Sequence, residues 1–285
     1  MSCATVVPRG NVTVPLNFYK APANGSKPYF IVSKEDSIAP EFNFTDHSVD
    51  VIIHDLRGSE NTFSLDRDAF QIVTDASPPS EGIDFSDNKS IRAHYYPEVQ
   101  QLISERLPGD VQIFIYDHTV RHQVEGEAQH RPLTRVHIDH TANNAIRRIR
   151  QFFPTEADRL LQGRYRIVNV WRPLNKKPLE SYPLAFASAS TFDNADVVPV
   201  QHRYKDGSLV REAGLIKHSS SQAWYYLSGM TDRERILLKC FDSDSLKEGS
   251  KIACKTPHTA FRDPRTQASA EGRFSIEVRG MVFGR

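Results

Sequence analysis

Short runs of β-forming residues, separated by turn residues, fill the second half of this 285-residue chain. Valine, isoleucine and aromatic residues favour strands, whereas the glycine, proline, asparagine and aspartate between the runs favour turns. Many short strands in such a series predict an antiparallel β-sandwich or barrel. We therefore expect a mainly β fold with strands at residues 111–117, 133–139, 165–171, 182–188, 209–218, 223–228, 235–241 and 274–283.

Other segments have different expected structures. Apolar residues recur at helical spacing in 95–109, and residues 143–153 and 156–162 are also helical in pattern, so we expect peripheral helices outside the sheets. Residues 49–56 should form a buried strand. The segment 189–207 lies between two expected strands and is long for a hairpin, so we expect a loop that covers the functional site and selects the substrate.

Composition limits the class of protein. The 36 basic and 35 acidic residues nearly cancel, which argues against a general nucleic-acid binder. The basic cluster "RRIR" (147–150) is interpreted as a solvated helix face. No apolar run approaches the roughly 20 residues of a membrane span. With no signal peptide and three cysteines outside any CxxC pair, the chain is expected in the cytoplasm.

The hexapeptide "RVHIDH" (135–140) places two histidines and an aspartate close together. On a strand, His137 and Asp139 point to one side and His140 to the other, because side chains alternate. An imidazole and a carboxylate so placed can bind one cation, as two of the three ligands of a 2-His-1-carboxylate iron site. The alternative is an exposed strand with ordinary polar residues.

A third ligand must come from elsewhere in the chain. His258, in "KTPHTAFRDP", is a candidate because it lies shortly before the last expected strand. Its alternative interpretation is an exposed loop histidine.

The last strand carries a second polar pattern, "GRFSIEV". Arg273 and Ser275 share one face with Glu277 and Arg279. A guanidinium beside a hydroxyl is a good receptor for a carboxylate, because the planar fork forms two hydrogen bonds and the hydroxyl adds a third. The alternative is an amphipathic strand with a surface arginine–glutamate pair.

Two further residues are candidates for the same pocket. Asn169 shares a strand face with Trp171, whereas Arg172 is expected on the other face in a structural role. Tyr116, together with Arg121 in "IYDHTVR", could reach the pocket from the strand before "RVHIDH". The alternative for the strand that contains Asn169 and Trp171 is core packing. The alternative for Tyr116 and Arg121 is a turn at the end of a strand.

The order of these motifs, HxD, a distant histidine and then RxS, resembles that of the Fe(II)/2-oxoglutarate oxygenases on the double-stranded β-helix (jelly-roll) fold. Blocks such as "VHIDHTANNAIRRI", "RYRIVNVWRPL" and "RFSIEVR" narrow the resemblance to a fungal family of gibberellin-desaturase-like and cephamycin-hydroxylase-like proteins. That family includes the meroterpenoid (novofumigatonin) endoperoxygenase. The resemblance runs from about residue 111 to 283.

The resemblance implies a role for each motif. His137, Asp139 and His258 would bind Fe(II), leaving positions for 2-oxoglutarate and O₂. Arg273 and Ser275 would bind the distal carboxylate of 2-oxoglutarate, although Arg279 stays an alternative. The family usually has an acidic residue between the arginine and the serine of this motif. Here Phe274 lies between Arg273 and Ser275, and its side chain should point away from the 2-oxoglutarate site.

The implied protein is a single oxygenase domain over 1–285, with an N-terminal arm, strands and helix in 1–110 and the β-helix core in 111–285. Its substrate would be an apolar polycyclic fungal metabolite, oxidised by hydroxylation, desaturation or endoperoxide formation. A non-oxidative cupin-like metalloenzyme and an inactive binding subunit remain alternatives, and the chain could be a monomer or a homodimer. The expected apolar pocket wall is Trp171, Phe186, Phe192, Trp224, Tyr225 and Phe261.

Overall fold

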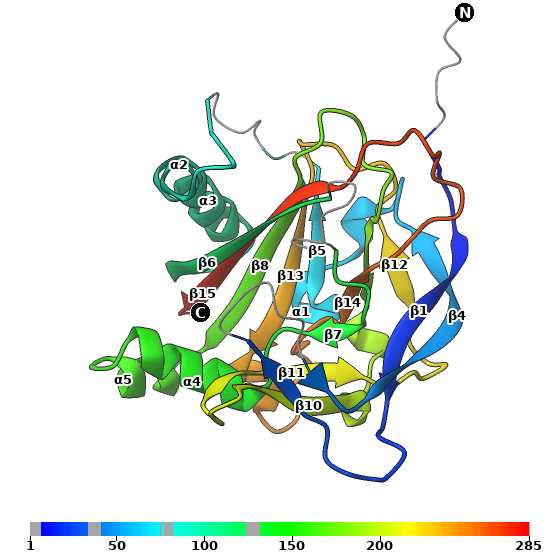
Figure 1. Ribbon diagram of the computed structural model, residues 1–285. Coiled ribbons are helices and arrows are strands. Elements are labelled where there is room, and N and C mark those ends of the chain that lie inside the picture. Colours follow the sequence, from blue (N-terminus) through cyan, green and yellow to red (C-terminus); the bar gives the residue numbers. More distant parts are fainter. Residues whose placement is uncertain (1–6, 34–40, 75, 77–81, 124–131, 285) are drawn as a thin grey trace, which may run out of the picture.

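Two β-sheets form the body of the protein in the computed structural model, which describes residues 7–33, 41–74, 76, 82–123 and 132–284 (Figure 1). The larger sheet has ten strands in the order β1-β4-β12-β9-β14-β7-β11-β10-β2-β3, and the smaller has five in the order β5-β13-β8-β15-β6. Most neighbouring strands are antiparallel; β10–β2 and β12–β4 are parallel. The prediction of a mainly β fold built from short antiparallel strands is confirmed.

The strands of the larger sheet come from the whole length of the chain. They are β1 (Val12–Lys20), β2 (Phe30–Val32), β3 (Glu41–Phe42), β4 (Thr45–Asp55), β7 (His137–Ile138), β9 (Leu184–Ala187), β10 (Val197–Tyr204), β11 (Leu209–Ile216), β12 (Trp224–Tyr226) and β14 (His258–Ala260). The smaller sheet consists of β5 (Phe70–Val73), β6 (Gln112–His122), β8 (Tyr165–Pro173), β13 (Arg235–Asp242) and β15 (Phe274–Phe283). Both sheets therefore include segments from the first 110 residues.

Helices cover the smaller sheet and its lower edge (Figure 1). Helix α3 (Tyr96–Arg106) buries its apolar stripe, including Val99 and Ile103, against Ile276 and Val278 of β15. Because side chains alternate along β15, those of its other face point toward the larger sheet. The helices predicted at 95–109, 143–153 and 156–162 are confirmed as α3, α4 (Ala142–Phe152) and α5 (Ala157–Gln162). The described residues also form the short helices α1 (Leu65–Asp68) and α2 (Asn88–Ser90), a π-helix at Ile91–Tyr95 and four short 3-10 helices. Among the described residues, no helix is long and apolar enough to cross a membrane.

Three expected elements differ in the structure. Residues 133–139 form only the short strand β7, with an isolated bridge at Arg135. The strand predicted as buried at 49–56 is β4, most of whose residues are exposed or half-buried. The expected lid 189–207 contains β10, which pairs with β11 along its length and buries Val200. Pairing with two neighbours makes this segment part of the sheet, and none of its residues lines the cavity described below.

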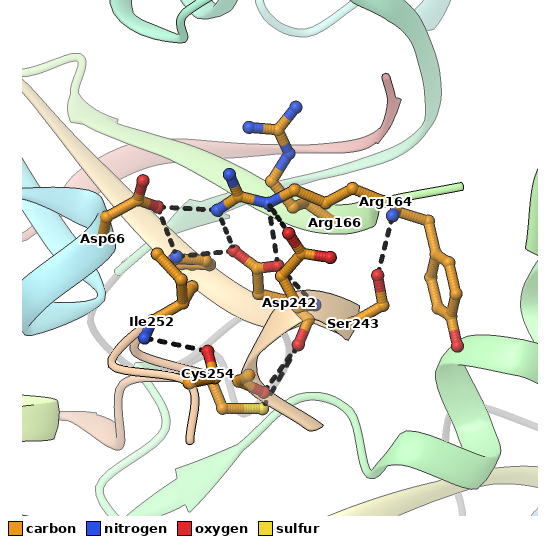
Figure 2. Close-up of polar contacts among 12 residues, drawn as sticks. Asp66, Arg164, Arg166, Asp242, Ser243, Ile252 and Cys254 are labelled. Carbon is orange, nitrogen blue, oxygen red and sulfur yellow. Dashed lines mark hydrogen bonds and ion pairs between the residues drawn. The ribbon is translucent and has the colours of Figure 1, made fainter. Parts of the chain in front are cut away.

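A buried ion network joins the smaller sheet to helix α1 (Figure 2). The carboxylate of Asp242 accepts hydrogen bonds from Arg164 Nη2 and from Lys239 Nζ, both at 2.7 Å. The same two cations reach Asp66 Oδ1, at 2.8 Å and 3.0 Å. The Asp242 side chain is fully buried, and that of Lys239 is 1% exposed. These charges are compensated by one another, so the network fixes the ends of β8 and β13 against α1.

Candidate functional site

A cavity of about 190 Å³ lies where the inward face of the smaller sheet meets the larger sheet. Its wall combines side chains of β6, β8 and β15 with side chains of β7, β11, β14 and helix α4. Most of the lining is polar or charged. The lining residues are Tyr116, Asp117, Thr119, Arg121, Leu133, His137, Asp139, His140, Arg148, Trp171, Leu184, Arg211, His258, Thr259, Ala260, Arg273, Glu277 and Arg279.

Three potential metal ligands converge in this cavity. His137 on β7 lies directly opposite His258 on β14, and their ring centroids are 4.5 Å apart. Asp139 follows β7, and its Oδ1 lies 3.6 Å from Nε2 of His137 and 4.0 Å from Nε2 of His258. The ligand atoms of the three residues all lie within 4.8 Å of one another. His258, whose alternative was an exposed loop position, is 3% exposed.

Backbone carbonyls orient both imidazoles. Nδ1 of His137 lies 2.8 Å from the carbonyl oxygen of Arg135, and Nδ1 of His258 lies 3.2 Å from that of Thr256. When each Nδ1–H donates to its carbonyl, each Nε2 presents a lone pair to the centre. Burial, reinforced by the neighbouring His258, lowers the pKa of His137 to about 3, so its imidazole is neutral at physiological pH. Neutral imidazole is the form that binds metals.

The carboxylate of Asp139 is held with one oxygen inward. Its Oδ2 accepts a 2.7 Å hydrogen bond from Nδ2 of Asn169 and lies 3.7 Å from Nε of Arg279, which leaves Oδ1 facing the histidines. Burial alone would raise the pKa of Asp139, but electrostatic interactions with His258 and Arg279 hold it well below its usual value. The group is therefore ionised and presents a single oxygen to the two histidines.

This donor set fits Fe(II). Two imidazole nitrogens and one carboxylate oxygen on one side of a centre are the ligands of non-haem iron oxygenases, and they leave the remaining coordination positions open. The orienting carbonyls and the amide of Asn169 are the outer partners that such a site requires.

His140 departs from the expected alternation. It was predicted to point away from the site, yet it lines the cavity, because β7 ends at Ile138 and the chain no longer alternates beyond it. Its Nε2 lies 3.0 Å from the hydroxyl of Tyr116, and its Nδ1 lies 2.7 Å from Nδ2 of Asn144. His140 is thus occupied by side-chain partners and lies outside the group of three converging ligands.

Arg273 immediately precedes β15 and is buried beside Trp171. Its Nε donates to Oγ of Ser275 at 2.9 Å, its Nη1 donates to the carbonyl oxygen of Tyr182 at 3.0 Å, and its guanidinium carbon lies 5.0 Å from the Trp171 ring centre. Among the described residues, no carboxylate forms an ion pair with it. Burial and the charge of Arg121 lower the pKa of Arg273 to about 9. Glu277 acts on this buried cation without an ion-pair contact, so the charge of Arg273 is only partly compensated by the described residues.

Arg279, the alternative carboxylate receptor, has a different environment. It forms ion pairs with Glu277, with Asp117 at 3.2 Å and with Asp139 at 3.7 Å. Three carboxylates therefore compensate its charge. The predicted shared face of Arg273, Ser275, Glu277 and Arg279 agrees with the structure, since Arg273, Glu277 and Arg279 all line the cavity.

The remaining candidates are distributed as follows. Tyr116 and Arg121 line the cavity, whereas Asn169 reaches only Asp139 and is not part of the lining. Arg172 points away, as predicted, with its guanidinium carbon 5.5 Å from the rings of Phe85 and of Tyr95. The predicted roles of Tyr116 and Asn169 in binding 2-oxoglutarate stay predictions.

The expected aromatic wall is largely absent from the cavity. Of the six aromatic residues proposed for it, Trp171 alone is a lining residue, whereas Phe186, Trp224 and Phe261 are buried in the apolar core. Sequence reasoning instead missed two arginines of the lining, Arg148 and Arg211. Arg148 belongs to the "RRIR" cluster interpreted as solvated, yet its Nε is buried. One turn separates it from Asn144, whose contact with His140 identifies the inward face of α4.

The role of Asn169 can be tested directly. Replacing Asn169 with alanine removes the donor that turns Oδ2 of Asp139 away from the centre, so we expect metal affinity to fall by about 10- to 100-fold, as for other outer-shell partners. Titration with Fe(II) or Mn(II) measures this affinity. The nearby variant Arg172→Gln is the control, because Arg172 lies on the opposite face of β8. Equal metal binding by wild type and Asn169→Ala would contradict the assignment.

Comparison with known proteins agrees with this geometry. A family model described as "Oxidoreductase/YMDC permease-like domain" matches residues 16–283. The chain is 34% identical to the hydroxylase/desaturase poxK of Penicillium oxalicum, over 97% of this chain and 92% of that protein. It is 30% identical to the Fe(II)/2-oxoglutarate-dependent dioxygenase nvfI of Aspergillus novofumigatus, over 90% of each.

A solved structure extends the comparison to the fold. The iron and alpha-ketoglutarate-dependent endoperoxidase NvfI superposes with a TM-score of 0.84 at 28% identity, covering 97% of this chain and 99% of that one. The predicted jelly-roll fold is thereby confirmed. The His–Asp–His group, the sequence relatives and the matching structure agree. The chain belongs to this oxidoreductase family and is an Fe(II)/2-oxoglutarate-dependent dioxygenase of the fungal secondary-metabolite type.

Proposed function

We propose that His137, Asp139 and His258 bind the iron and that Arg273 with Ser275 binds the distal carboxylate of 2-oxoglutarate. The observation that carries this proposal is the pairing of two features in one cavity. Two imidazole nitrogens and one carboxylate oxygen lie within 4.8 Å of one another. The buried guanidinium of Arg273, which has no ion pair with a carboxylate of the described residues, lines the same cavity. A dicarboxylate that reaches both would supply the missing counter-charge.

Each side chain then has a defined task. Bound Fe(II), with 2-oxoglutarate and O₂, supplies the oxidising power that removes a hydrogen atom from the substrate. The protein holds the ligands in place through the carbonyls of Arg135 and Thr256 and the amide of Asn169. The buried walls around Trp171 limit access of water, and the cavity positions one C–H bond of the substrate next to the metal.

The substrate we propose is a largely apolar, polycyclic fungal metabolite, and meroterpenoid biosynthesis is the proposed setting. The relatives that support this are a hydroxylase/desaturase and an endoperoxidase. Hydroxylation, desaturation and endoperoxide formation all begin with removal of one hydrogen atom. They differ in what the substrate radical meets next, which depends on how the substrate lies in the cavity.

The proposed centre has a direct test. Under anaerobic conditions, Fe(II) and 2-oxoglutarate should together give the weak visible absorption of an iron-bound 2-oxo acid, and admission of O₂ should yield succinate. A non-oxidative cupin-like metalloenzyme would bind the metal without that absorption, and an inactive binding subunit would bind neither. Absence of both the absorption and succinate would overturn the proposal.

The 2-oxoglutarate site is tested by Arg273→Gln. A hydrogen bond to a charged partner contributes roughly 1.5–3 kcal/mol, so we expect the 2-oxoglutarate requirement to rise by about one to two orders of magnitude. Ser275→Ala should have a smaller effect, because one neutral donor contributes about 1 kcal/mol. Titration of the anaerobic Mn(II) protein with 2-oxoglutarate measures both, and a larger defect in Arg279→Gln than in Arg273→Gln would identify Arg279 as the receptor.

Partners and location follow as proposals. We infer a single oxygenase domain over 1–285 that takes a small-molecule substrate in the cytoplasm, without nucleic-acid or membrane partners. The near-neutral charge and the free thiols of Cys240 and Cys254 support this inference. Sedimentation of the purified chain distinguishes a monomer from a homodimer.

A further inference from the structure

Two arginines of the cavity have no part in the proposed iron and 2-oxoglutarate sites. Arg148 projects from α4 and Arg211 from β11, and both belong to the cavity lining. Arg279, which contacts Asp139 beside the metal ligands, stands six residues from Arg273, about 20 Å along an extended strand. The charges that act on Arg211 include those of Asp139, Arg279 and Arg148, and Arg211 in turn acts on Arg121, which also acts on Arg273. The pair therefore belongs to the part of the cavity lining that is close to Asp139 and Arg279.

The hydrogen-bonding capacity of both guanidinium groups is largely unused. Nε of Arg211 lies 3.4 Å from Nδ1 of His202. Nε of Arg148 is buried without a hydrogen-bond partner, and its Nη1 reaches only Oε1 of Gln151, at the long distance of 3.5 Å. Within the described part of the chain, no carboxylate forms an ion pair with either arginine. A buried or half-buried cation without a counter-charge is costly unless a ligand supplies one.

The surrounding structure holds the two arginines in place. Arg147 donates from Nη2 to the carbonyl oxygen of Val210 at 2.6 Å, and the backbone N–H of Glu212 donates to Oδ1 of Asn144 at 3.3 Å. These contacts fix α4 against β11 on both sides of Arg211. The guanidinium carbon of Arg148 also lies 5.9 Å from the ring centre of Tyr116. The two cations are thus presented by fixed elements, although their like charges repel.

The charge balance of the cavity also favours binding of an anion. Its described lining has five arginines and three carboxylates, a surplus of two positive charges. The charges of Fe(II) and of the 2-oxoglutarate dianion cancel, so the surplus remains when both are bound. The described lining as a whole therefore stays positive when the organic substrate binds.

We propose that Arg148 and Arg211 form a receptor for an anionic group, a carboxylate, on the organic substrate. This inference rests on the proposed function and deepens it, because it makes the substrate an acid on an apolar skeleton rather than a neutral hydrocarbon. Two guanidinium groups can share one carboxylate through charge-assisted hydrogen bonds. The carboxylate would fix the orientation of the skeleton, and so decide which C–H bond lies nearest the metal.

Matched pairs of an acid and its methyl ester test the receptor. We would use 1-naphthoic acid and dehydroabietic acid, each with its ester, and measure binding by equilibrium dialysis to the anaerobic Mn(II)/2-oxoglutarate protein. For at least one pair, the acid should bind about tenfold or more tightly than the ester, equivalent to about 1.4 kcal/mol. The preference should decrease at high salt, because screening weakens a partly exposed ion pair.

Variants assign the preference to these side chains. In Arg148→Gln and Arg211→Gln the acid should lose most of its advantage over the ester, while Arg211→Lys should keep part of it. Arg150→Gln is the matched control, because Arg150 belongs to the same helix and is exposed. Retained binding of Mn(II) and 2-oxoglutarate shows that each variant is folded.

Two results would overturn the receptor. One is equal binding of acid and ester by the wild-type protein for every pair, and the other is an unchanged preference in both glutamine variants. Failure of the proposed function is separate, since it would be seen as loss of the 2-oxoglutarate absorption and of succinate formation. The dialysis is also repeated without metal and 2-oxoglutarate, so that binding of the acid is measured independently of the iron and 2-oxoglutarate sites.

Discussion

Alanine at His137, Asp139 or His258 is expected to abolish turnover and to weaken iron binding by at least about a hundredfold, more than loss of an outer-shell partner causes. Each of these residues supplies one of three converging ligand atoms, and no other histidine, cysteine or acidic side chain of the described residues joins that group. Iron content after gel filtration and succinate formation measure the two effects.

Two histidine variants serve as controls for the metal prediction. His94 is exposed, so His94→Ala should leave both iron and activity unchanged. His140→Ala should keep the iron, because His140 is bonded to Tyr116 and Asn144 instead of facing the ligand group. Full activity in Asp139→Ala, or loss of iron in His140→Ala alone, would refute the ligand assignment.

The second large effect is expected on stability, at the buried ion network of Figure 2. Asp242→Ala leaves Lys239 almost fully buried, with Asp66 as its remaining anion. Breaking a buried ion pair by removing one partner typically costs 3–5 kcal/mol, because the other charge stays desolvated. We therefore expect the free energy of unfolding of Asp242→Ala to fall by about 3–5 kcal/mol. Urea denaturation followed by circular dichroism measures this change.

An exposed ion pair provides the comparison. Asp158 lies 3.7 Å from Arg150, and the two side chains are 91% and 64% exposed. Because water and salt screen such pairs, Asp158→Ala should leave the free energy of unfolding nearly unchanged. If Asp242→Ala were no less stable than Asp158→Ala, the network would have no role in holding β8 and β13 to α1.

Much of this fold could be predicted from local sequence pattern. The alternation in 273–283 correctly separates Arg273, Glu277 and Arg279 from Ile276 and Val278, because β15 is a long strand between two others. Helix α3 was predicted with similar accuracy, since the helical spacing of its apolar residues is a local signal. Where an element is long and buried on one side, the periodicity of its apolar residues is sufficient.

Short elements were harder to predict. Strand β14 has three residues and β7 has two, so each exists because of its neighbours rather than its own propensity. The same cause produced the error at His140, where alternation was extended beyond the end of β7. The segment that contains β10 was expected to be a loop because of its length, yet β10 pairs with β11 and β2. These outcomes depend on tertiary contacts that no local window contains.

The polar lining of the cavity could not be predicted from local sequence pattern either. Apolar aromatics such as Phe186 and Trp224 were expected at the cavity wall, but they fill the core, where their large apolar surfaces are best buried. Charged residues that sequence reasoning placed in solvent, such as Arg148, turned inward. Whether an arginine of an amphipathic helix faces water or a polar cavity depends on what the opposite sheet presents.

The short strands of the site have a consequence for the life of the protein in the cell. Strands β7 and β14 pair with each other at one position, His137 with His258, whereas β6 and β15 pair at ten. A metal ion bound by His137 and His258 would join, through side chains, two strands that the backbone joins at a single position. A ligand that binds only the folded chain stabilises it as its concentration rises, and weakly joined strands open first. The iron concentration should therefore affect how quickly proteases degrade this enzyme, as well as its rate of turnover.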